Sequence, residues 1–233
     1  MKRAIRRTFT LIKALRGQDV FACRDICIPC ERLGSAYGGW TTITDRISAD
    51  TIIYSFGIGD DASFDLALIE RFGACVYAFD PTPKSIEWTK LNSLPSSFIM
   101  NPVGLADFDG QALFAPPEDP SHVSHTLLER PATQREAISV PVRRLSTIMH
   151  ELGHTHVDIL KMDIEGAEYA VIDDMYQTAI RPEQILVEFH HRFSGVGASK
   201  TRVAIRTLRK MGYQLFAISE TNEEFSFCRI KSA

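Results

Sequence analysis

The sequence predicts an α/β protein with a Rossmann-like, mostly parallel sheet and helices on both faces. Three observations predict this class. Residues 51–71 pass from an apolar strand through a glycine turn into an amphipathic helix, and residues 157–168 repeat the construction with an acidic turn. Near the end of the chain, two apolar segments joined by a polar turn predict an antiparallel pair that closes the sheet. A chain of 233 residues can bury one good core of this kind, but it is too short for two ordinary domains.

The first unit places glycines and acids between its strand and its helix. The strand at 51–56 runs into Gly57, Gly59, Asp60 and Asp61, and the helix follows at 63–71. A second buried strand at 75–79 ends at Asp80. In Rossmann-type nucleoside sites, an acid about 20 residues beyond the glycine turn binds the ribose hydroxyls. Asp80 is therefore predicted to be a ribose ligand.

The second unit places acids where its strand ends. An apolar strand is predicted at 157–160, and Asp163, Glu165 and Glu168 follow it. Parallel strands end at the edge of the sheet where open α/β folds bind ligands. Glu165 and Glu168 could instead occupy the first turn of a helix, where the helix dipole favours negative charge. Asp163 precedes that helix, so Asp163 and Glu165 are predicted to be site residues.

Charge favours one class of cofactor over another. The glycines at 57 and 59, with Ala62, also fit the dinucleotide fingerprint of an NAD-dependent oxidoreductase. A pyrophosphate binds bare backbone N–H groups, however, and the acids predicted around this crevice would repel it. S-adenosylmethionine carries an ammonium and a sulfonium group. The acidic crevice therefore predicts S-adenosylmethionine as the cofactor.

The chain resembles the FkbM family of S-adenosylmethionine-dependent methyltransferases over about residues 54–230. The resemblance rests on residues 76–81, 157–168 and 185–190, and its most specific part is the Lys-x-Asp-x-Glu-Gly-x-Glu element that begins at Lys161. It implies the class I methyltransferase fold: seven strands in the order 3-2-1-4-5-7-6, with an antiparallel C-terminal hairpin. It also implies methylation of a hydroxyl oxygen on a sugar, a polyketide or a similar small molecule.

The resemblance also extends the predicted cofactor site. It implies that the segment after the third strand lies under the adenine, which adds Gly104 and Leu105. The family's first turn usually begins with an acid, whereas this chain has Ser55 and Phe56 before Gly57. Asp60 or Asp61 would then have to hold the methionine ammonium. The full predicted cofactor site is Phe56, Gly57, Gly59, Asp60, Asp61, Asp80, Pro81, Gly104, Leu105, Asp163 and Glu165.

Methyl transfer to a hydroxyl needs a group that takes the proton, because the methyl carbon is already activated. The predicted strand at 184–189 delivers Glu188, His190 and His191 to the edge that carries Asp163. Alternation puts Glu188 and His190 on one face and His191 on the other. His190 is the leading candidate base, followed by His191 and Glu188. Two alternatives remain open: a divalent cation held by Asp163, Glu188 and His190, or a nucleoside-binding module without catalysis.

Two segments are predicted to contact the acceptor. Glycines surround Tyr37 and Trp40, so this turn could fold over the pocket, although it could equally be a turn with two core anchors. Residues 116–136 are polar, contain prolines and lack periodicity, and a loop of this length is usually functional or disordered. His122 and His125, with Ser124 between them, are candidate acceptor ligands within it.

Composition limits the remaining possibilities. A net charge of −3 does not indicate the basic surface that nucleic-acid binding requires. No apolar run reaches the ~18 residues needed to span a membrane. We therefore expect a cytoplasmic enzyme whose partner is a small-molecule acceptor, with no stable membrane insertion; the oligomeric state is not predicted. The domain is expected at 49–233, preceded at 1–48 by an extension made of a basic helix and a strand and turn that cover the pocket.

Cys23, Cys27 and Cys30 have the spacing of an iron–sulfur site. Their alternating context predicts an extended strand that separates the thiols, so no cluster is expected. Cys75 and Cys228 lie in apolar segments and are predicted to be small core residues.

Overall fold

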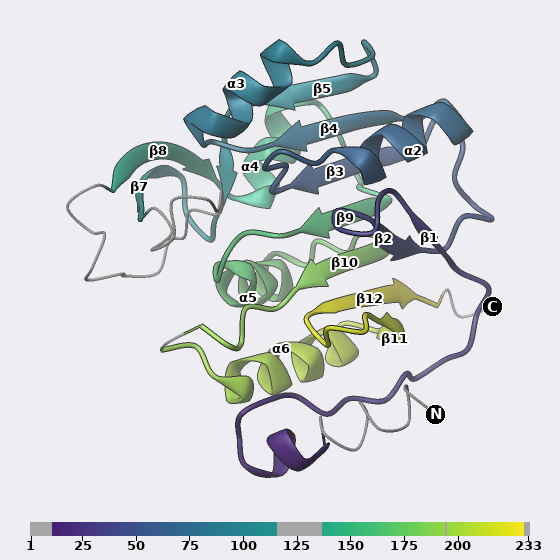
Figure 1. Cartoon of the computed structure of the whole chain (residues 1–233), viewed down its shortest axis with the longest axis vertical. Coiled ribbons are helices and arrows are strands. Elements are labelled where there is room, and N and C mark those ends of the chain that lie inside the picture. Colours follow the sequence, from purple (N-terminus) through teal and green to yellow (C-terminus); the bar gives the residue numbers. More distant parts are fainter. Residues whose placement is uncertain (1–10, 116–136, 194, 231–233) are drawn as a thin grey trace.

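The central sheet of the molecule has seven strands (Figure 1). We describe a computed structural model that covers residues 11–115, 137–193 and 195–230. From edge to edge the strands are β11 (Tyr213–Ile218), β12 (Glu224–Arg229), β10 (Gln184–Glu188), β9 (Ile159–Met162), β3 (Ile52–Phe56), β4 (Cys75–Phe79) and β5 (Phe98–Asn101). The strands from β10 to β5 are parallel, and β12 is antiparallel to both of its neighbours. The predicted order 3-2-1-4-5-7-6 is confirmed.

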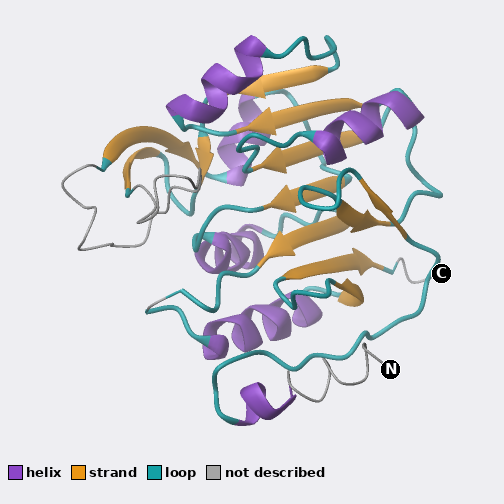
Figure 2. Cartoon of the chain, in the orientation of Figure 1, coloured by secondary structure: helices purple, strands orange, loops and turns teal. Residues whose placement is uncertain are grey.

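Helices lie on both faces of the main sheet (Figure 2), and alternation along the strands divides the core into two layers. Tyr54 and Phe56 face one side, where they pack with helices α4 (Leu145–Glu151), α5 (Glu168–Thr178) and α6 (Ala198–Lys210). Ile53 faces the other side, which is covered by helix α2 (Ser63–Phe72) and by the hairpin of β1 (Glu31–Leu33) and β2 (Trp40–Thr42). Helix α3 (Pro83–Leu91) contributes Trp88, which packs against a further apolar cluster that includes Ala78 of β4. Helices therefore cover both faces, as the sequence predicts.

A second sheet of three strands, which the sequence analysis did not predict, stands beside the main one. Its order is β6 (Gly104–Leu105), β8 (Ile138–Arg143) and β7 (Gly110–Phe114), around a small core that includes Phe114 and Val142. In Figure 1 it lies on the left, the side to which the arrowheads of the parallel strands point. The chain connecting β7 to β8 includes residues 116–136, so the predicted acceptor ligands His122 and His125 lie outside the described residues.

The fourth strand along the main sheet ends two residues later than the sequence predicts. The apolar character of the segment placed it at 157–160, but β9 runs to Met162. Lys161 and Met162 pair with Ser55 and Phe56 of β3, so the parallel ladder carries them into the sheet. Lys161 is therefore a buried strand residue, and Asp163 follows the strand directly.

The N-terminal segment shares contacts and core with the rest of the domain. Residues 11–15 are helical. Asp19 accepts hydrogen bonds from Asn222 and pairs with His191 and Arg192, and Val20 lies in the same apolar cluster as Tyr54. Among the described residues, no helix combines the length and apolar character needed to cross a bilayer.

The cysteine-bearing segment is not a strand. Residues 20–30 run without regular structure, because their backbone bonds few neighbours beyond the contact of Asp25 with Leu215. Cys23, Cys27 and Cys30 are exposed there. Cys75 and Cys228 lie in β4 and β12, and Cys228 is buried in the core as predicted.

Candidate functional site

A cavity of about 1060 Å³ opens at the carboxyl edge of the parallel strands. Its wall is formed by the ends of β3, β4, β9 and β10, by the turn after β1, by β6 and by the turn between β11 and β12. The structure places all eleven residues predicted to bind the cofactor in this wall: Phe56, Gly57, Gly59, Asp60, Asp61, Asp80, Pro81, Gly104, Leu105, Asp163 and Glu165. The predictions from four separate segments therefore converge on one site.

Gly57 lets two strand ends meet at the floor of the cavity. Its φ is 80°, and a Cβ built on it would lie 1.8 Å from the backbone oxygen of Asp163. Its N–H donates to Phe79 at 3.0 Å. Only glycine combines this left-handed backbone with so close an approach. The first glycine of the turn is thus required by the packing of β3 against β9.

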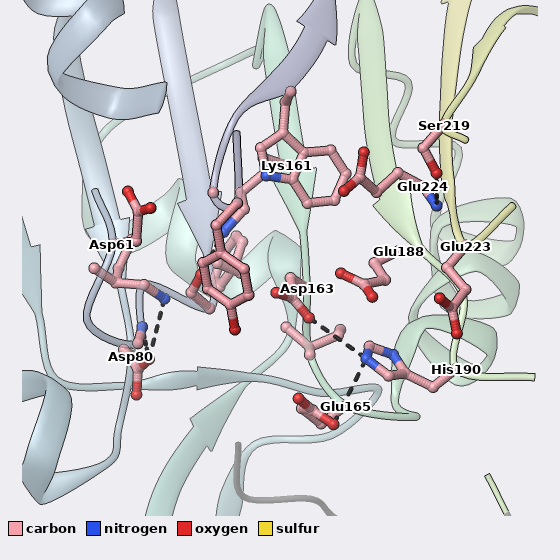
Figure 3. A pocket seen from close by; sticks show the side chains of 18 of the residues that line it. Asp61, Asp80, Lys161, Asp163, Glu165, Glu188, His190, Ser219, Glu223 and Glu224 are labelled. Atoms are coloured by element: carbon pink, nitrogen blue, oxygen red, sulfur yellow. Dashed lines mark hydrogen bonds and ion pairs between the residues drawn. The ribbon is translucent and has the colours of Figure 1, made fainter. Parts of the chain in front are cut away.

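Asp80 holds the glycine turn from the neighbouring strand (Figure 3). Its Oδ2 accepts from the backbone N–H groups of Ile58 and Gly59, both at 3.1 Å, and its Oδ1 accepts from the backbone and the hydroxyl of Thr82 at 2.9 and 2.6 Å. A carboxylate has about four lone-pair sites, so these bonds use its acceptor capacity. A ribose hydroxyl would have to share Asp80 with the turn or displace Thr82. The ribose role stays a prediction.

Asp61 ties the N-terminal turn to the glycine turn. Its Oδ2 accepts from the hydroxyl of Ser35 at 2.7 Å, and its Oδ1 accepts from the backbone of Ser63 at 2.8 Å. Burial would raise the pKa of Asp61, but these hydrogen bonds outweigh it and lower that pKa. A Cβ on Gly38 would lie 2.5 Å from the Asp61 carboxyl carbon. The glycine beside Tyr37 therefore allows this turn to close over the cavity.

His190 lies at the centre of a cluster of carboxylates (Figure 3). Its Nδ1 is 2.6 Å from Oε1 of Glu168, and its Nε2 is 3.6 Å from both Oδ1 of Asp163 and Oε2 of Glu165. Burial alone would lower the pKa of His190, but the charges of Glu168, Glu165 and Asp163 hold it well above the usual value. Both ring nitrogens of His190 therefore face carboxylates.

Glu188 is the last residue of β10 and lines the cavity beside this cluster. Burial, together with the nearby carboxylate of Asp163, raises the pKa of Glu188 to about 8. Burial likewise raises the pKa of Asp163, against the opposing charges of Lys161 and His190. In this half of the cavity, the carboxyl groups of Glu188 and Asp163 therefore lie close together and are poorly solvated.

The other predicted residues differ in how they reach the cavity. Tyr37 is 80% exposed at its mouth, whereas Trp40 is 4% exposed and belongs mainly to the core. His191 does not line the cavity. Its ring is buried against the N-terminal segment, where Nε2 lies 2.9 Å from Oδ1 of Asp19. The predicted alternation thus removes His191 from contact with a ligand in this cavity.

The sequence analysis missed several lining residues. Lys161 donates to the backbone oxygen of Gly57, and its Nζ lies 5.6 Å from the centre of the Trp40 ring. A lysine inside an otherwise apolar strand was the signal that could have identified it. Arg32 and Glu224, which pair at 3.1 Å, and Glu223 also line the wall. They come from segments far apart in the sequence, and no local pattern marks them.

Comparisons with known proteins agree with this geometry. Residues 52–215 match the family described as the methyltransferase FkbM domain. The chain is 27% identical over 150 residues to the human probable methyltransferase-like protein 24, covering 63% of this chain and 34% of the relative. The rat protein of that name is 26% identical over 176 residues, covering 70% of this chain and 42% of the relative. This chain thus spans between a third and a half of the length of these curated relatives.

The fold has a counterpart among solved structures. The crystal structure of methyltransferase FkbM from Methylobacillus flagellatus KT superposes with a TM-score of 0.51 at 13% sequence identity, covering 78% of this chain and 44% of that one. The seven-stranded sheet with its antiparallel hairpin and the acidic cavity at the strand ends define a class I methyltransferase domain, whose cofactor is S-adenosylmethionine. The chain belongs to the FkbM methyltransferase family.

Proposed function

We propose that this protein transfers the methyl group of S-adenosylmethionine to a hydroxyl oxygen of a small molecule such as a sugar or a polyketide. The observation that carries the proposal is the continuity of one cavity between the glycine turn and the group formed by Asp163, Glu188 and His190. Pockets for a single small ligand hold about 300–1,000 Å³. A cavity of about 1060 Å³ therefore offers room for the cofactor and for a small acceptor.

The residues around the glycine turn fit a cationic cofactor. Asp60, Asp61 and Asp163 line the cavity, and opposite charges placed there attract an ammonium or sulfonium group. Gly104 and Leu105 form a small apolar wall that suits an adenine ring, with Phe56 and Pro81 nearby in the same lining. When bound, the cofactor supplies an activated methyl group. Its negatively charged surroundings would repel the pyrophosphate of NAD, which disfavours an oxidoreductase.

We assign the proton-accepting role to Glu188 in its ionised form, which a pKa of about 8 makes available at mildly alkaline pH. Both ring nitrogens of His190, the leading candidate from the sequence, face carboxylates, and its Nδ1 is bound to Glu168. Glu188 lines the same cavity, and no hydrogen bond among the described residues occupies its carboxylate. The acceptor oxygen would form its bond to the methyl carbon as the sulfur–carbon bond breaks, and the hydroxyl proton would pass to Glu188. Cavity walls that hold the two reactants in line provide most of the remaining acceleration.

The acceptor is expected between the turn at Tyr37 and the turn joining β11 to β12. Tyr37 stands exposed at the mouth, and Glu223 and Glu224 line the wall opposite the glycine turn. Acidic side chains can accept hydrogen bonds from several hydroxyls, so this surface suits a polyhydroxylated molecule. The family resemblance suggests the same chemical class.

Transfer of an isotopically labelled methyl group tests the proposal. Purified protein is incubated with S-adenosylmethionine carrying a ¹³C-labelled methyl group and with a small-molecule extract of its host. Untargeted mass spectrometry should find a compound heavier by one labelled methyl group, bound through oxygen. A labelled product methylated at nitrogen or carbon would contradict the hydroxyl acceptor. Cofactor binding without any labelled product, either from this extract or from a parallel incubation with macromolecules of the host, would instead indicate a nucleoside-binding module.

A further inference from the structure

Three metal-binding side chains converge on one point beside the proposed acceptor position. Asp163, Glu165 and His190 each offer one ligand atom, and these atoms lie within 4.8 Å of one another. Figure 3 shows the two carboxylates directed toward the same edge of the imidazole ring. Asp163 and Glu165 come from the turn after β9, and His190 comes from the chain after β10. Two neighbouring strand ends thus build the cluster.

The orientation of His190 is that of a metal ligand. Histidines that bind metals almost always donate their second ring N–H to a carboxylate or carbonyl, which fixes the ring and directs the other nitrogen at the ion. Here Nδ1 lies 2.6 Å from Oε1 of Glu168, a side chain with no exposed surface. Glu168 is held in turn by the N–H of Gly166 at 3.0 Å. The His190 side chain is 8% exposed, and its Nε2 faces the cluster.

The distances leave room for an ion between the three groups. Nε2 of His190 lies 3.6 Å from Oδ1 of Asp163 and 3.6 Å from Oε2 of Glu165, which is beyond hydrogen-bond distance. Two ligand atoms that each lie about 2.1 Å from the same ion are separated by about 3 to 4 Å. Oδ1 of Asp163 is also buried and has no hydrogen-bond donor among the described residues. A shared ion would satisfy this atom.

The negative charge of the surrounding carboxylates also favours a cation at this position. Asp163, Glu165 and Glu168 surround one imidazole, and Glu188 adds a further carboxylate nearby. Lys161 approaches from within the sheet, but its ammonium group donates to the backbone oxygen of Gly57. Carboxylates that are partly or fully buried together are costly unless a positive charge compensates them. A divalent cation would supply that charge.

We propose that Asp163, Glu165 and His190 bind one divalent cation and that Glu168 orients the imidazole. Carboxylate and imidazole ligands together suit a first-row ion such as Mn²⁺. The sequence analysis named Asp163, Glu188 and His190 as possible ligands, whereas the cluster in the structure has Glu165 in place of Glu188. Glu188 is therefore not a ligand and can act as the base beside the ion. Resting on the proposed function, the inference adds that open coordination positions hold the acceptor hydroxyl, so that the ion favours loss of its proton to Glu188.

Binding of Mn²⁺ to the purified full chain tests the site without cofactor or acceptor. Electron paramagnetic resonance follows the loss of the free Mn²⁺ signal as chelator-treated protein is titrated with MnCl₂. One ion should bind per chain in a saturable manner. Glu165→Gln and, in a second variant, Asp163→Asn should each weaken the affinity at least tenfold, because loss of a direct ligand should cost no less than the about 10–100-fold that loss of a residue supporting a ligand costs. Thermal unfolding confirms that each variant is folded.

Glu223→Gln is the matched control, because it removes one negative charge from the same cavity wall without touching the cluster. Its Mn²⁺ affinity should stay within threefold of the parent protein. Absence of saturable binding, or equal weakening in Glu223→Gln and Glu165→Gln, would overturn the site. Because this readout involves no methyl transfer, saturable Mn²⁺ binding beside a failed transfer assay would count against the proposed function alone. Intact transfer without Mn²⁺ binding would count against the metal site alone.

Discussion

Replacing Gly57 by alanine is expected to lower the free energy of unfolding by about 2–5 kcal/mol and to abolish binding of S-adenosylmethionine. A left-handed backbone costs a residue with a Cβ about 1–2 kcal/mol. Overpacking adds about 1–3 kcal/mol, because the new methyl group would overlap the backbone oxygen of Asp163 at 1.8 Å. The new Cβ is fixed to the main chain of residue 57, and its partner is the main chain of Asp163, so neither can move without separating β3 from β9. Chemical denaturation and calorimetry measure the two effects.

Gly59→Ala provides the control for this prediction. Gly59 also has a positive φ, 58°, but a Cβ there would meet no heavy atom within 4 Å. The free energy of unfolding of this variant should fall only by the cost of the left-handed backbone, about 1–2 kcal/mol. The variant should still bind the cofactor. If Gly57→Ala keeps the affinity of the parent protein, or if both variants lose the same stability, the close contact between the two strand ends is not what requires glycine.

Glu188→Gln is expected to lower kcat for methyl transfer by about 10²–10⁴-fold, the usual contribution of a general base. The amide keeps the shape of the side chain but cannot accept the hydroxyl proton. Since Glu188 lies on the acceptor side of the cavity, the affinity for S-adenosylmethionine should stay within about threefold, or under ~1 kcal/mol. Initial rates with the acceptor identified by mass spectrometry, and calorimetry with the cofactor, give the two values.

Glu223→Gln again serves as the comparison, because Glu223 lines the same wall and pairs with Arg192 at 2.8 Å. Its kcat should fall far less than that of Glu188→Gln. A Glu188→Gln enzyme that retains kcat within threefold would remove Glu188 as the base. Loss of kcat on His190→Gln, with Mn²⁺ binding retained, would then return the role to His190, the candidate favoured by the sequence.

The sequence predicted most of the site because the site lies where parallel strands end. Asp80, Asp163 and Glu188 each follow or end a buried strand, and the topology brings such positions to one edge. The positions of these residues could therefore be inferred without any knowledge of their contacts. The hydrogen bonds that these residues make could not be inferred from the sequence. Nothing local in the sequence shows that Asp80 holds the N–H groups of Ile58 and Gly59.

Other features depend on contacts between distant segments. The sheet of β6, β8 and β7 joins strands separated by residues 116–136, and its short apolar stretches carry no clear signal. Lys161 was placed after its strand because a charged residue usually ends an apolar run, whereas Gly57 and Trp40 accommodate it inside the sheet. The alternation at 20–30 suggested a strand, but no partner strand lies beside it among the described residues. Periodicity alone does not create a strand without such a partner.

Calorimetric titration with S-adenosylmethionine tests the central claim most directly, and Asp80→Ala shows where the ligand binds. The parent protein should bind one cofactor per chain. Asp80→Ala should weaken binding by ~1–3 kcal/mol, because it removes the carboxylate that holds the turn and is predicted to contact the ribose. Asp109→Ala, which loses a carboxylate bound to Arg144 and Thr147 away from the cavity, should bind as the parent does. No heat with S-adenosylmethionine or S-adenosylhomocysteine, alongside clear binding of a nicotinamide dinucleotide, would contradict the account.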